Sequence, residues 1–411
     1  MTDHYVIIGN SAAAVGCIEG IRATDKQGRI TLISDEPYHT YSRPLISYLL
    51  WGKTSEERMK YRPDDFYEKN GVRTLLGHRA LAIDNVMKRV TLDDGEQIPY
   101  EKLLVATGSK PFVPPMNGLD LVTKKFSFMK LDDAHALADA LTADARVLVI
   151  GAGLIGLKCV EGIKDRCGQI TVVDLAPRIL PSILDENGSA LVQKFLEGKG
   201  IRFILSDSVD SFEANAATLK SGRKLDFDVL VLAVGVRPNT ELVSAAGGEV
   251  NRGIVTNLRC ETTLDDVYAA GDCALSHDIT LDQDRILALL PNAYMQGYAA
   301  GVNMAGGDAK WDRAMAMNAI GFFGLHIITA GSYTGHVYEK STEDSYKKLF
   351  YQDNKLKGFI LIGDVMRAGI YTSLIREETP LDTVDFELIC EKPQLMAFTR
   401  HERAKQLSTS H

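Results

Sequence analysis

The stretch 4-HYVIIGNSAAAVGCIEGIRA-23 decides the fold of this chain. It begins with an apolar, β-branched run, turns at Gly9 and continues into small residues, which predicts a buried strand, a tight turn and a helix. The turn lies where a dinucleotide-binding loop has the pattern G-x-G-x-x-G, but Ser11 and Ala14 replace the second and third glycines. The apolar run 29–34 predicts the next strand, so we expect a βαβ unit here.

A second unit of the same kind begins about 140 residues later. The segment 146-RVLVIGAGLIGLKCVEGI-163 predicts a strand, a turn and a helix, and its loop has all three glycines. An acidic residue follows the second strand of each unit: Asp35 or Glu36 in the first, Asp174 in the second. Two such loops, each followed by an acid, indicate two Rossmann-like dinucleotide-binding halves in a doubly wound α/β fold.

The remaining sequence predicts further strands and a change of character towards the C-terminus. In the first 310 residues we expect strands at 103–106, 227–235 and 265–271, and a helix at 291–306. The last hundred residues favour an α+β region, with antiparallel strands within 317–331, 345–353 and 355–364, turns at Gly331 and Asp353-Asn354, and a helix at 368–378. The predicted domains are residues 1–112 with 246–310, residues 113–245, and a C-terminal α+β domain at 311–411.

Composition excludes several classes of function. The net charge of -8 argues against nucleic acid as a partner. No apolar run approaches the ~20 residues of a membrane span, and the first residues lack the features of a signal peptide, so we expect a cytoplasmic protein. The six cysteines form no C-x-x-C pair, and we interpret them as buried free thiols, with no metal site or iron–sulfur cluster in the chain.

Five motifs in a fixed order carry a family resemblance. They are 9-GNSAAA-14, 106-ATGS-109, 151-GAGLIG-156, 234-VGVRPNT-240 and 268-YAAGDCA-274. Together they resemble the pyridine nucleotide–disulfide oxidoreductase superfamily, which has FAD and NAD domains like those of glutathione reductase. The segments 37-PYHTYSRPLIS-47 and 358-GFILIGD-364 are most similar to its rubredoxin-reductase and nitrite-reductase-large-subunit branch. They also resemble the NADH-oxidising FAD subunits of anaerobic complexes such as phenylglyoxylate dehydrogenase and tungsten aldehyde oxidoreductase.

The resemblance implies that the first loop holds FAD. A helix N-terminus favours the pyrophosphate, and serine is small enough for close approach. After the second strand, Asp35 is the preferred ligand of the adenosine ribose, with Glu36 as its neighbour, unless these are charges of a solvated turn. Asp272 is expected at a ribityl hydroxyl, and Asn292 at a helix N-terminus near the flavin pyrimidine edge. The other implied FAD contacts are Gly9, Ser11, Ala12, Ala13, Ala14, Arg43, Ala80, Ala106, Thr107 and Gly108.

The second loop should hold the nicotinamide cofactor. Its implied contacts are Gly151, Gly153, Leu154, Ile155 and Gly156, with Gly235 close to the nicotinamide end. A carboxylate at Asp174 binds the ribose 2′-hydroxyl and repels a 2′-phosphate, so we predict NADH rather than NADPH. Arg178 leaves the alternative open, since an arginine there can hold a 2′-phosphate.

Two departures from the family pattern bear on the chemistry. The segment 38-YHTYSRPLISYLLWG-52, where relatives have a redox cysteine, contains no cysteine, and Ser42 and Ser47 are small polar residues in it. Relatives of this branch also often place a lysine and a glutamate near the flavin, where this chain has Tyr48 and Lys158. Lys158 either supplies positive charge near the flavin or is a helix lysine that reaches solvent. His39 and His326 are interpreted as surface or packing residues rather than flavin contacts.

These features predict an FAD-containing NADH:acceptor oxidoreductase without a redox-active cysteine. We expect electrons to leave the flavin directly for a protein partner: a rubredoxin, a ferredoxin or an iron–sulfur subunit of a larger complex, such as an aldehyde or 2-oxoacid oxidoreductase. The chain is then a subunit of a hetero-oligomer or a homodimer, with 322-FFGLH-326 and the polar tail 400–411 as candidate docking surfaces. The alternatives are an NADH oxidase that uses oxygen and an NADH-sensing interaction protein without turnover.

Overall fold

The computed structural model describes residues 4–399, so the predicted docking tail 400–411 lies outside the described residues. The chain divides into two compact units. Of the described residues, the larger unit contains 4–177, 200–277 and 284–314, and the smaller contains 178–199, 278–283 and 315–399. The three-domain division drawn from the sequence stays a prediction.

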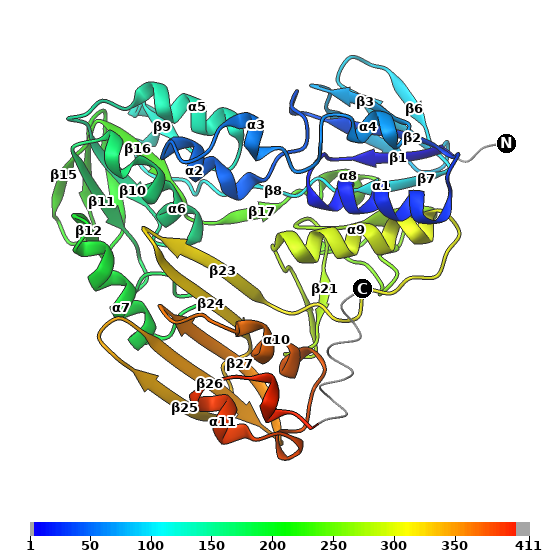
Figure 1. Ribbon diagram of the computed structural model, residues 1–411. Helices are drawn as coiled ribbons and strands as arrows, with labels where there is room; N and C mark the ends of the chain where they lie inside the picture. Colours follow the sequence, from blue (N-terminus) through cyan, green and yellow to red (C-terminus); the bar gives the residue numbers. More distant parts are fainter. Residues whose placement is uncertain (1–3, 400–411) are drawn as a thin grey trace. The chain divides into compact units, whose positions relative to one another are not determined.

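The first half of the larger unit is built on a parallel sheet with the order β20-β7-β1-β2-β3 (Figure 1). Its strands are β1 (His4–Ile8), β2 (Arg29–Ser34), β3 (Val72–Leu76), β7 (Lys102–Val105) and β20 (Val267–Ala269). Successive side chains of β1 alternate between two cores, as the pleat of a strand requires. Tyr5 and Ile7 pack with α1 (Ala12–Thr24) and α9 (Leu290–Met304), whereas Val6 and Ile8 pack under an antiparallel sheet. That sheet consists of β4 (Ala80–Asp84), β5 (Arg89–Leu92) and β6 (Gln97–Pro99).

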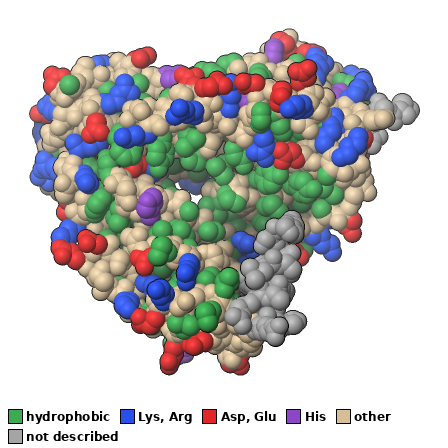
Figure 2. Space-filling view, in the orientation of Figure 1, with side chains coloured by type: hydrophobic (Ala, Val, Ile, Leu, Met, Phe, Trp, Pro, Cys, Tyr) green, Lys and Arg blue, Asp and Glu red, His purple; other side chains and the backbone are tan. Residues whose placement is uncertain are grey.

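Glycines bring α1 and α9 into direct backbone contact. A Cβ atom at Gly16 would lie 2.2 Å from the carbonyl oxygen of Tyr294, and one at Gly297 would lie 2.0 Å from that of Ala13. Gly20 and Gly301 repeat the arrangement one turn further along each helix. Figure 2 shows apolar side chains gathered over this helix pair. The close contact with α9 therefore fixes the position of α1, the helix that follows the first loop.

The second half repeats the design with the parallel order β12-β11-β10-β16-β9. Its strands are β9 (Lys125–Phe126), β10 (Arg146–Ile150), β11 (Gln169–Val173), β12 (Ile201–Ile204) and β16 (Val229–Leu232), with helices α5 (Leu131–Ala140) and α6 (Leu154–Ile163). An antiparallel sheet of β13 (Val209–Glu213), β14 (Ala216–Leu219) and β15 (Lys224–Asp226) packs on it. The predicted pair of Rossmann-like halves in an α/β fold is confirmed.

Short elements connect and decorate the two halves. The strands β8 (Ser109–Pro111) and β17 (Val236–Pro238) pair antiparallel where the chain crosses between the halves. The other short elements are α2 (Ile46–Leu50), α3 (Glu56–Met59), α4 (Phe66–Lys69), α8 (Glu241–Ala245), β18 (Val250–Asn251), β19 (Gly253–Ile254), β21 (Ser276–Asp278) and β22 (Gln283–Arg285). Within residues 4–399, no helix has the length and hydrophobicity that crossing a membrane requires.

The smaller unit contains an antiparallel sheet with the order β23-β24-β27-β26-β25. The strands are β23 (Met317–Phe322), β24 (Leu325–Gly331), β25 (His336–Ser341), β26 (Tyr346–Gln352) and β27 (Lys355–Ile362), with helices α7 (Glu186–Glu197), α10 (Ala368–Arg376) and α11 (Phe386–Glu391). The turn at Asp353-Asn354 is present, and both residues have the positive φ of a two-residue hairpin. A second such turn, at Phe323-Gly324, divides the segment in which the sequence suggested a turn only at Gly331.

Candidate functional site

The first loop places a free helix N-terminus at the end of β1. Gly9 has a φ of +118°, and a Cβ atom there would lie 2.1 Å from the carbonyl oxygen of Ala106. Ser11 precedes α1, and its hydroxyl makes no capping hydrogen bond. The first N–H groups of a helix have no acceptor within it, so those of Ala12 and Ala13 can donate to an anion. Ala14 is fully buried behind them.

The second loop has the same backbone conformation at its first glycine, but it leaves no room for a side chain at its third. Gly151 has a φ of +113°, and a Cβ atom there would lie 2.2 Å from the carbonyl oxygen of Ala233. A Cβ atom at Gly156 would lie 2.1 Å from the carbonyl oxygen of Gly151, whereas one at Gly153 meets nothing within 4 Å. The outer side of the loop at Gly153 is therefore open to a phosphate, while Gly156 closes the inner side.

The side chain of Asp174 holds the backbone of the second loop by a hydrogen bond. Its Oδ2 accepts a hydrogen bond from the Ala152 N–H at 2.6 Å, and its Oδ1 accepts one from the Ala176 N–H at 2.7 Å. An ionised carboxylate has about four lone-pair positions, so both oxygens can still accept hydroxyl groups. Arg178 belongs to the smaller unit, and its Nε donates to the Leu184 carbonyl oxygen at 3.4 Å.

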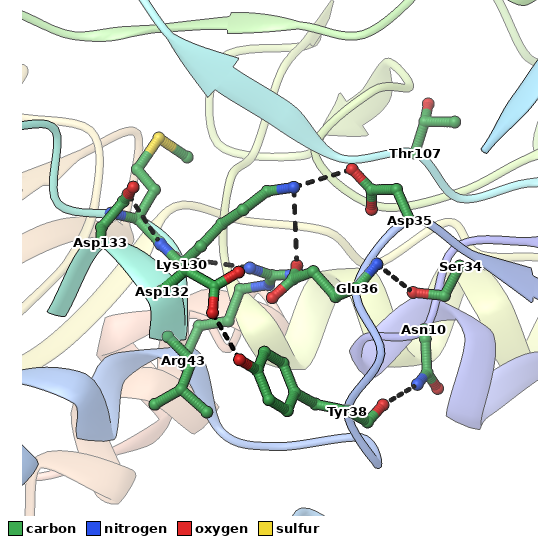
Figure 3. A network of polar contacts seen from close by, with 12 residues as sticks. Asn10, Ser34, Asp35, Glu36, Tyr38, Arg43, Thr107, Lys130, Asp132 and Asp133 are labelled. Atoms are coloured by element: carbon green, nitrogen blue, oxygen red, sulfur yellow. Dashed lines mark hydrogen bonds and ion pairs between the residues drawn. The ribbon is translucent and has the colours of Figure 1, made fainter. Parts of the chain in front are cut away.

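The acidic pair after β2 divides into one buried and one exposed carboxylate (Figure 3). Glu36 is 4% exposed, accepts a hydrogen bond from the Tyr41 hydroxyl at 2.6 Å and forms an ion pair with Arg43 at 2.5 Å. Asp35 is exposed and accepts a hydrogen bond from Lys130 Nζ at 2.8 Å. The structure commits Glu36 to Arg43, which leaves Asp35 as the acid that faces solvent. Lys130 is a residue that the sequence did not single out.

Asp272 is a carboxylate without a hydrogen-bond donor among the described residues. It follows Gly271, whose N–H donates to Gln296 Oε1 at 2.9 Å. Burial raises the pKa of Asp272 to about 6, although Arg43 acts in the opposite direction. A carboxylate in such surroundings lacks partners that hydroxyl groups of a ligand would supply.

The ATG turn is tied to the VRPNT motif. Thr107 Oγ1 donates to the Asn239 carbonyl oxygen at 2.8 Å, and Asn239 Nδ2 donates to the Thr107 carbonyl oxygen at 2.9 Å. Gly108 and Gly235 both have positive φ, and a Cβ atom at either meets nothing within 4 Å. The two turns therefore expose backbone on the larger unit without side chains to block it.

Two other residues that were predicted to contact FAD, Ala80 and Asn292, make contacts within the protein. Ala80 begins β4 and pairs with Leu92. The Asn292 side chain is buried; its Nδ2 donates to the Leu287 carbonyl oxygen at 3.1 Å and its Oδ1 accepts from Trp311 Nε1 at 2.7 Å. Any contact of Asn292 with a flavin must then come from its backbone at the start of α9.

Lys158 lies between helices of the two halves. Its Nζ forms an ion pair with Glu161 and lies 4.4 Å from the ring centroid of Tyr48, on α2. Its side chain is 18% exposed, so it is not an ordinary solvent-reaching lysine. At Gly162 a Cβ atom would lie 2.7 Å from the Ser47 carbonyl oxygen, which shows how closely α2 and α6 approach.

The cysteines are buried thiols, and among residues 4–399 one group of side chains has the spacing of metal ligands. All six cysteines are buried and free, and burial raises the pKa of Cys167 and Cys390 to about 11 and that of Cys260 to about 12. Burial also raises the pKa of Cys17, Cys159 and Cys273, so all six are protonated thiols at neutral pH. His39 packs on the Tyr67 ring with centroids 4.7 Å apart, and His326 is exposed on β24. His78, Asp93 and Asp94 form a surface group with metal-ligand spacing that the sequence did not indicate.

Comparison with known proteins agrees with this geometry. Residues 3–297 match the family model described as pyridine nucleotide-disulphide oxidoreductase, and residues 319–379 match the rubredoxin NAD+ reductase C-terminal domain. The chain is 32% identical, over 92% of each chain, to the NADH-dependent phenylglyoxylate dehydrogenase subunit epsilon of Aromatoleum evansii. It is also 32% identical to the assimilatory nitrate reductase electron transfer subunit of Bacillus subtilis (strain 168), over 90% of this chain but 49% of that protein, so it spans about half of that relative's length. A chain in the crystal structure of the covalent putidaredoxin reductase–putidaredoxin complex has the same fold, with a TM-score of 0.88, 24% identity and 99% of both chains covered.

Proposed function

Because the chain belongs to the pyridine nucleotide-disulphide oxidoreductase family, we propose that it carries electrons from NADH through FAD to a separate redox protein. The resemblance found in its motifs is confirmed, and the chain is an oxidoreductase with FAD and NADH as cofactors. FAD, when bound, supplies the hydride-accepting and electron-releasing chemistry. The protein supplies binding, orientation and charge.

The first half offers a cradle that fits FAD. The free N–H groups at the start of α1 and the Ser11 hydroxyl suit a pyrophosphate, and the exposed Asp35 suits ribose hydroxyls. The carboxylate of Asp272, which accepts no hydrogen bond from the described residues, suits a ribityl hydroxyl, and Arg43 only partly offsets the effect of its burial. Ala106, Thr107 and Gly108 offer backbone at the end of β7.

The second half suits an exchangeable dinucleotide. We assign the NADH pyrophosphate to the open side of the loop at Gly153, with Leu154 and Ile155 as the first residues of the following helix. Asp174 is the proposed ligand of the adenosine ribose, and Gly235 the backbone turn nearest the nicotinamide.

The burial and protonation of the cysteine thiols are the main reason to propose an electron acceptor outside this chain. Every cysteine of the chain is buried with a raised pKa, and the segment before α3 has hydroxyl groups, such as those of Ser42 and Ser47, but no cysteine at residues 38–52. A hydroxyl cannot take part in thiol–disulfide exchange, and a buried protonated thiol attacks slowly. Electrons that reach the FAD therefore have no internal disulfide to reduce.

The C-terminal match supports a protein acceptor of the rubredoxin or iron–sulfur type. Residues 319–379 match a domain described for rubredoxin NAD+ reductases, and the Aromatoleum relative is a subunit of a larger dehydrogenase. We propose that this chain likewise works with a redox protein or as a subunit of a complex. Phe322 of the predicted docking segment is fully buried, whereas Gly324 and His326 are exposed to a partner.

The test compares acceptors with the purified, FAD-loaded chain. We expect NADH to reduce rubredoxin, ferredoxin or a viologen much faster than it drives oxygen consumption. Oxygen consumption as fast as reduction of the best acceptor would instead identify an NADH oxidase. Negligible turnover with every acceptor, together with an NADH-dependent change in oligomeric state, would identify a sensing protein.

A further inference from the structure

A lysine from the second half reaches the acidic pair of the first half. Lys130 immediately precedes α5, and its Nζ lies 2.8 Å from Asp35 Oδ2 and 4.0 Å from Glu36 Oε1. Asp35 and Lys130 are 95 residues apart in sequence. Figure 3 shows the Lys130 side chain extended from the start of α5 towards both carboxylates.

The backbone around Lys130 is fixed from two sides. Within α5, Asp133 Oδ2 accepts hydrogen bonds from the Met129 N–H at 2.8 Å and the Lys130 N–H at 3.1 Å. From the first half, the Tyr41 hydroxyl accepts one from the Leu131 N–H at 3.1 Å. The main chain from which the Lys130 side chain extends is therefore held in place, and the contact with Asp35 holds its ammonium group.

The charges explain why a cation is needed there. Arg43 already neutralises Glu36, and the side chain of Asp35 is 52% exposed. Without Lys130, the uncompensated negative charge of Asp35 would add to the two negative charges of the FAD pyrophosphate held at the first loop. A cation beside it lets the carboxylate accept hydroxyl groups without repelling the rest of the dinucleotide.

We propose that Lys130 is a positioning residue for the adenosine end of FAD, acting through Asp35; this rests on the assignment of FAD to the first loop. The ligand that gains from it is a flavin dinucleotide, because a mononucleotide has no adenosine ribose to place at Asp35. FAD affinity then depends on the placement of α5, which belongs to the second half.

The test measures FAD release from the full-length, FAD-loaded protein on dilution, followed by the recovery of flavin fluorescence. Lys130→Gln is expected to raise the FAD dissociation constant about fivefold at low salt, and below twofold at 1 M salt, because the interaction is exposed and screened. Lys130→Arg should restore the affinity, and FMN binding should not change. The matched control is Lys124→Gln, which removes the same charge from an exposed position of the second half.

A double-mutant cycle separates this role from a structural one. In an Asp35→Asn background the effect of Lys130→Gln should largely disappear, because the charge that it compensates is gone. Equal FAD affinity of Lys130→Gln and Lys124→Gln, or additive effects with Asp35→Asn, would overturn the inference. Failure of the wild-type protein to retain FAD would instead defeat the proposed function.

Discussion

The two glycine loops begin alike and then diverge. In both, the first glycine has positive φ and its Cα faces a carbonyl oxygen, that of Ala106 in the first loop and that of Ala233 in the second. In both, the residue that replaces or supplies the second glycine accepts the first helical hydrogen bond: Val15 N–H to Ser11 O at 3.1 Å, and Leu157 N–H to Gly153 O at 3.0 Å. The strand-to-helix path is therefore shared, although the two loops have glycine in common at only the first of the three motif positions.

The two halves differ in the positions of the small residues that allow close backbone contacts, and in the roles of their acidic residues. The first loop accommodates Ala14, and the glycines of that half lie behind it, in the contact of α1 with α9. The second loop needs glycine at its own third position, and Asp174 holds its backbone. In the first half, Asp272 has no such task, so its carboxylate remains for a ligand. The first loop matches the glycine pattern poorly because its half makes its close backbone contacts elsewhere, and the poor match does not mean that a binding site has been lost.

The largest effect on stability is expected from a substitution in the contact between α1 and α9, behind the first loop. Gly297→Ala would place a Cβ atom 2.0 Å from the Ala13 carbonyl oxygen and force α9 away from α1. We expect a loss of about 3 kcal/mol in the free energy of unfolding, measured by urea denaturation. The control is Gly369→Ala in α10, where a Cβ atom meets nothing within 4 Å, with an expected gain of about 0.5–1 kcal/mol. Equal stabilities of the two variants would contradict the tight packing.

Exchanging the third positions of the loops should give unequal results. Gly156→Ala would put a Cβ atom 2.1 Å from the Gly151 carbonyl oxygen, and we expect about 2 kcal/mol lower stability and at least a tenfold weaker NADH affinity. Ala14→Gly removes one buried methyl group and should cost about 1 kcal/mol with FAD retained. Equilibrium unfolding and NADH titration measure both variants. A tolerated alanine at 156 would refute the steric difference.

The buried carboxylate of Asp272 should make the stability of the FAD-free protein depend on pH. Burial raises the pKa of Asp272 from near 4 to about 6, so the folded FAD-free protein binds its proton more tightly than the unfolded chain does. Stability is then lost as the pH rises from about 4 to about 6. Asp272→Asn should make the FAD-free protein about 1–2 kcal/mol more stable at pH 7 and leave it unchanged at pH 4, while it holds FAD less tightly.

Asp174→Asn is the matched comparison for that experiment. Asp174 accepts two backbone hydrogen bonds, so its replacement should destabilise the protein by about 1–3 kcal/mol at pH 7. Thermal unfolding at both pH values measures the pair of variants. A destabilised Asp272→Asn variant at pH 7 would show that this carboxylate also has a structural task.

A smaller effect is expected from Lys158, near the start of the helix that follows the second loop. If this half-buried cation stabilises negative charge on the reduced flavin, Lys158→Gln should lower the two-electron midpoint potential by about 15–30 mV. Tyr48→Phe keeps the ring under the ammonium group and should leave the potential in place. Spectroelectrochemical titration of the two variants decides; an unchanged potential in Lys158→Gln would remove the proposed role.

The smallest effect is expected at Ser11. Its hydroxyl makes no capping hydrogen bond in the protein, so it is free to donate to a phosphate oxygen. Ser11→Gly should weaken FAD binding about two- to fivefold, the size of one hydrogen bond, and leave the unfolding transition nearly unchanged. FAD retention measured by gel filtration and fluorescence provides the check. Undiminished retention would show that the backbone alone holds the pyrophosphate.

The sequence predicted the features that depend on local periodicity. Both βαβ units, the long helix that became α9 and the hairpin at Asp353-Asn354 have strong patterns of apolar or turn residues, and they are where they were expected. The sheets β4–β6 and β13–β15 were missed because their strands are short and alternate irregularly between buried and exposed residues. β25 was missed for a similar reason, since most of its side chains are exposed.

The features that were not predictable depend on contacts between distant segments. Nothing in the sequence around Lys130 indicates that it meets Asp35, 95 residues away. In the same way, the adjacent acids Asp35 and Glu36 look equivalent until Arg43 and Tyr41 bury one of them. The roles of the site residues themselves stay predictions that the variants above will decide.

The paired crossing strands β8 and β17 have a mechanical consequence. The chain passes between the two halves twice, and the two passages are joined by a strand ladder and by the reciprocal Thr107–Asn239 hydrogen bonds. Because this ladder ties the two passages together, neither can shift along the chain without the other, which two separate linkers would allow.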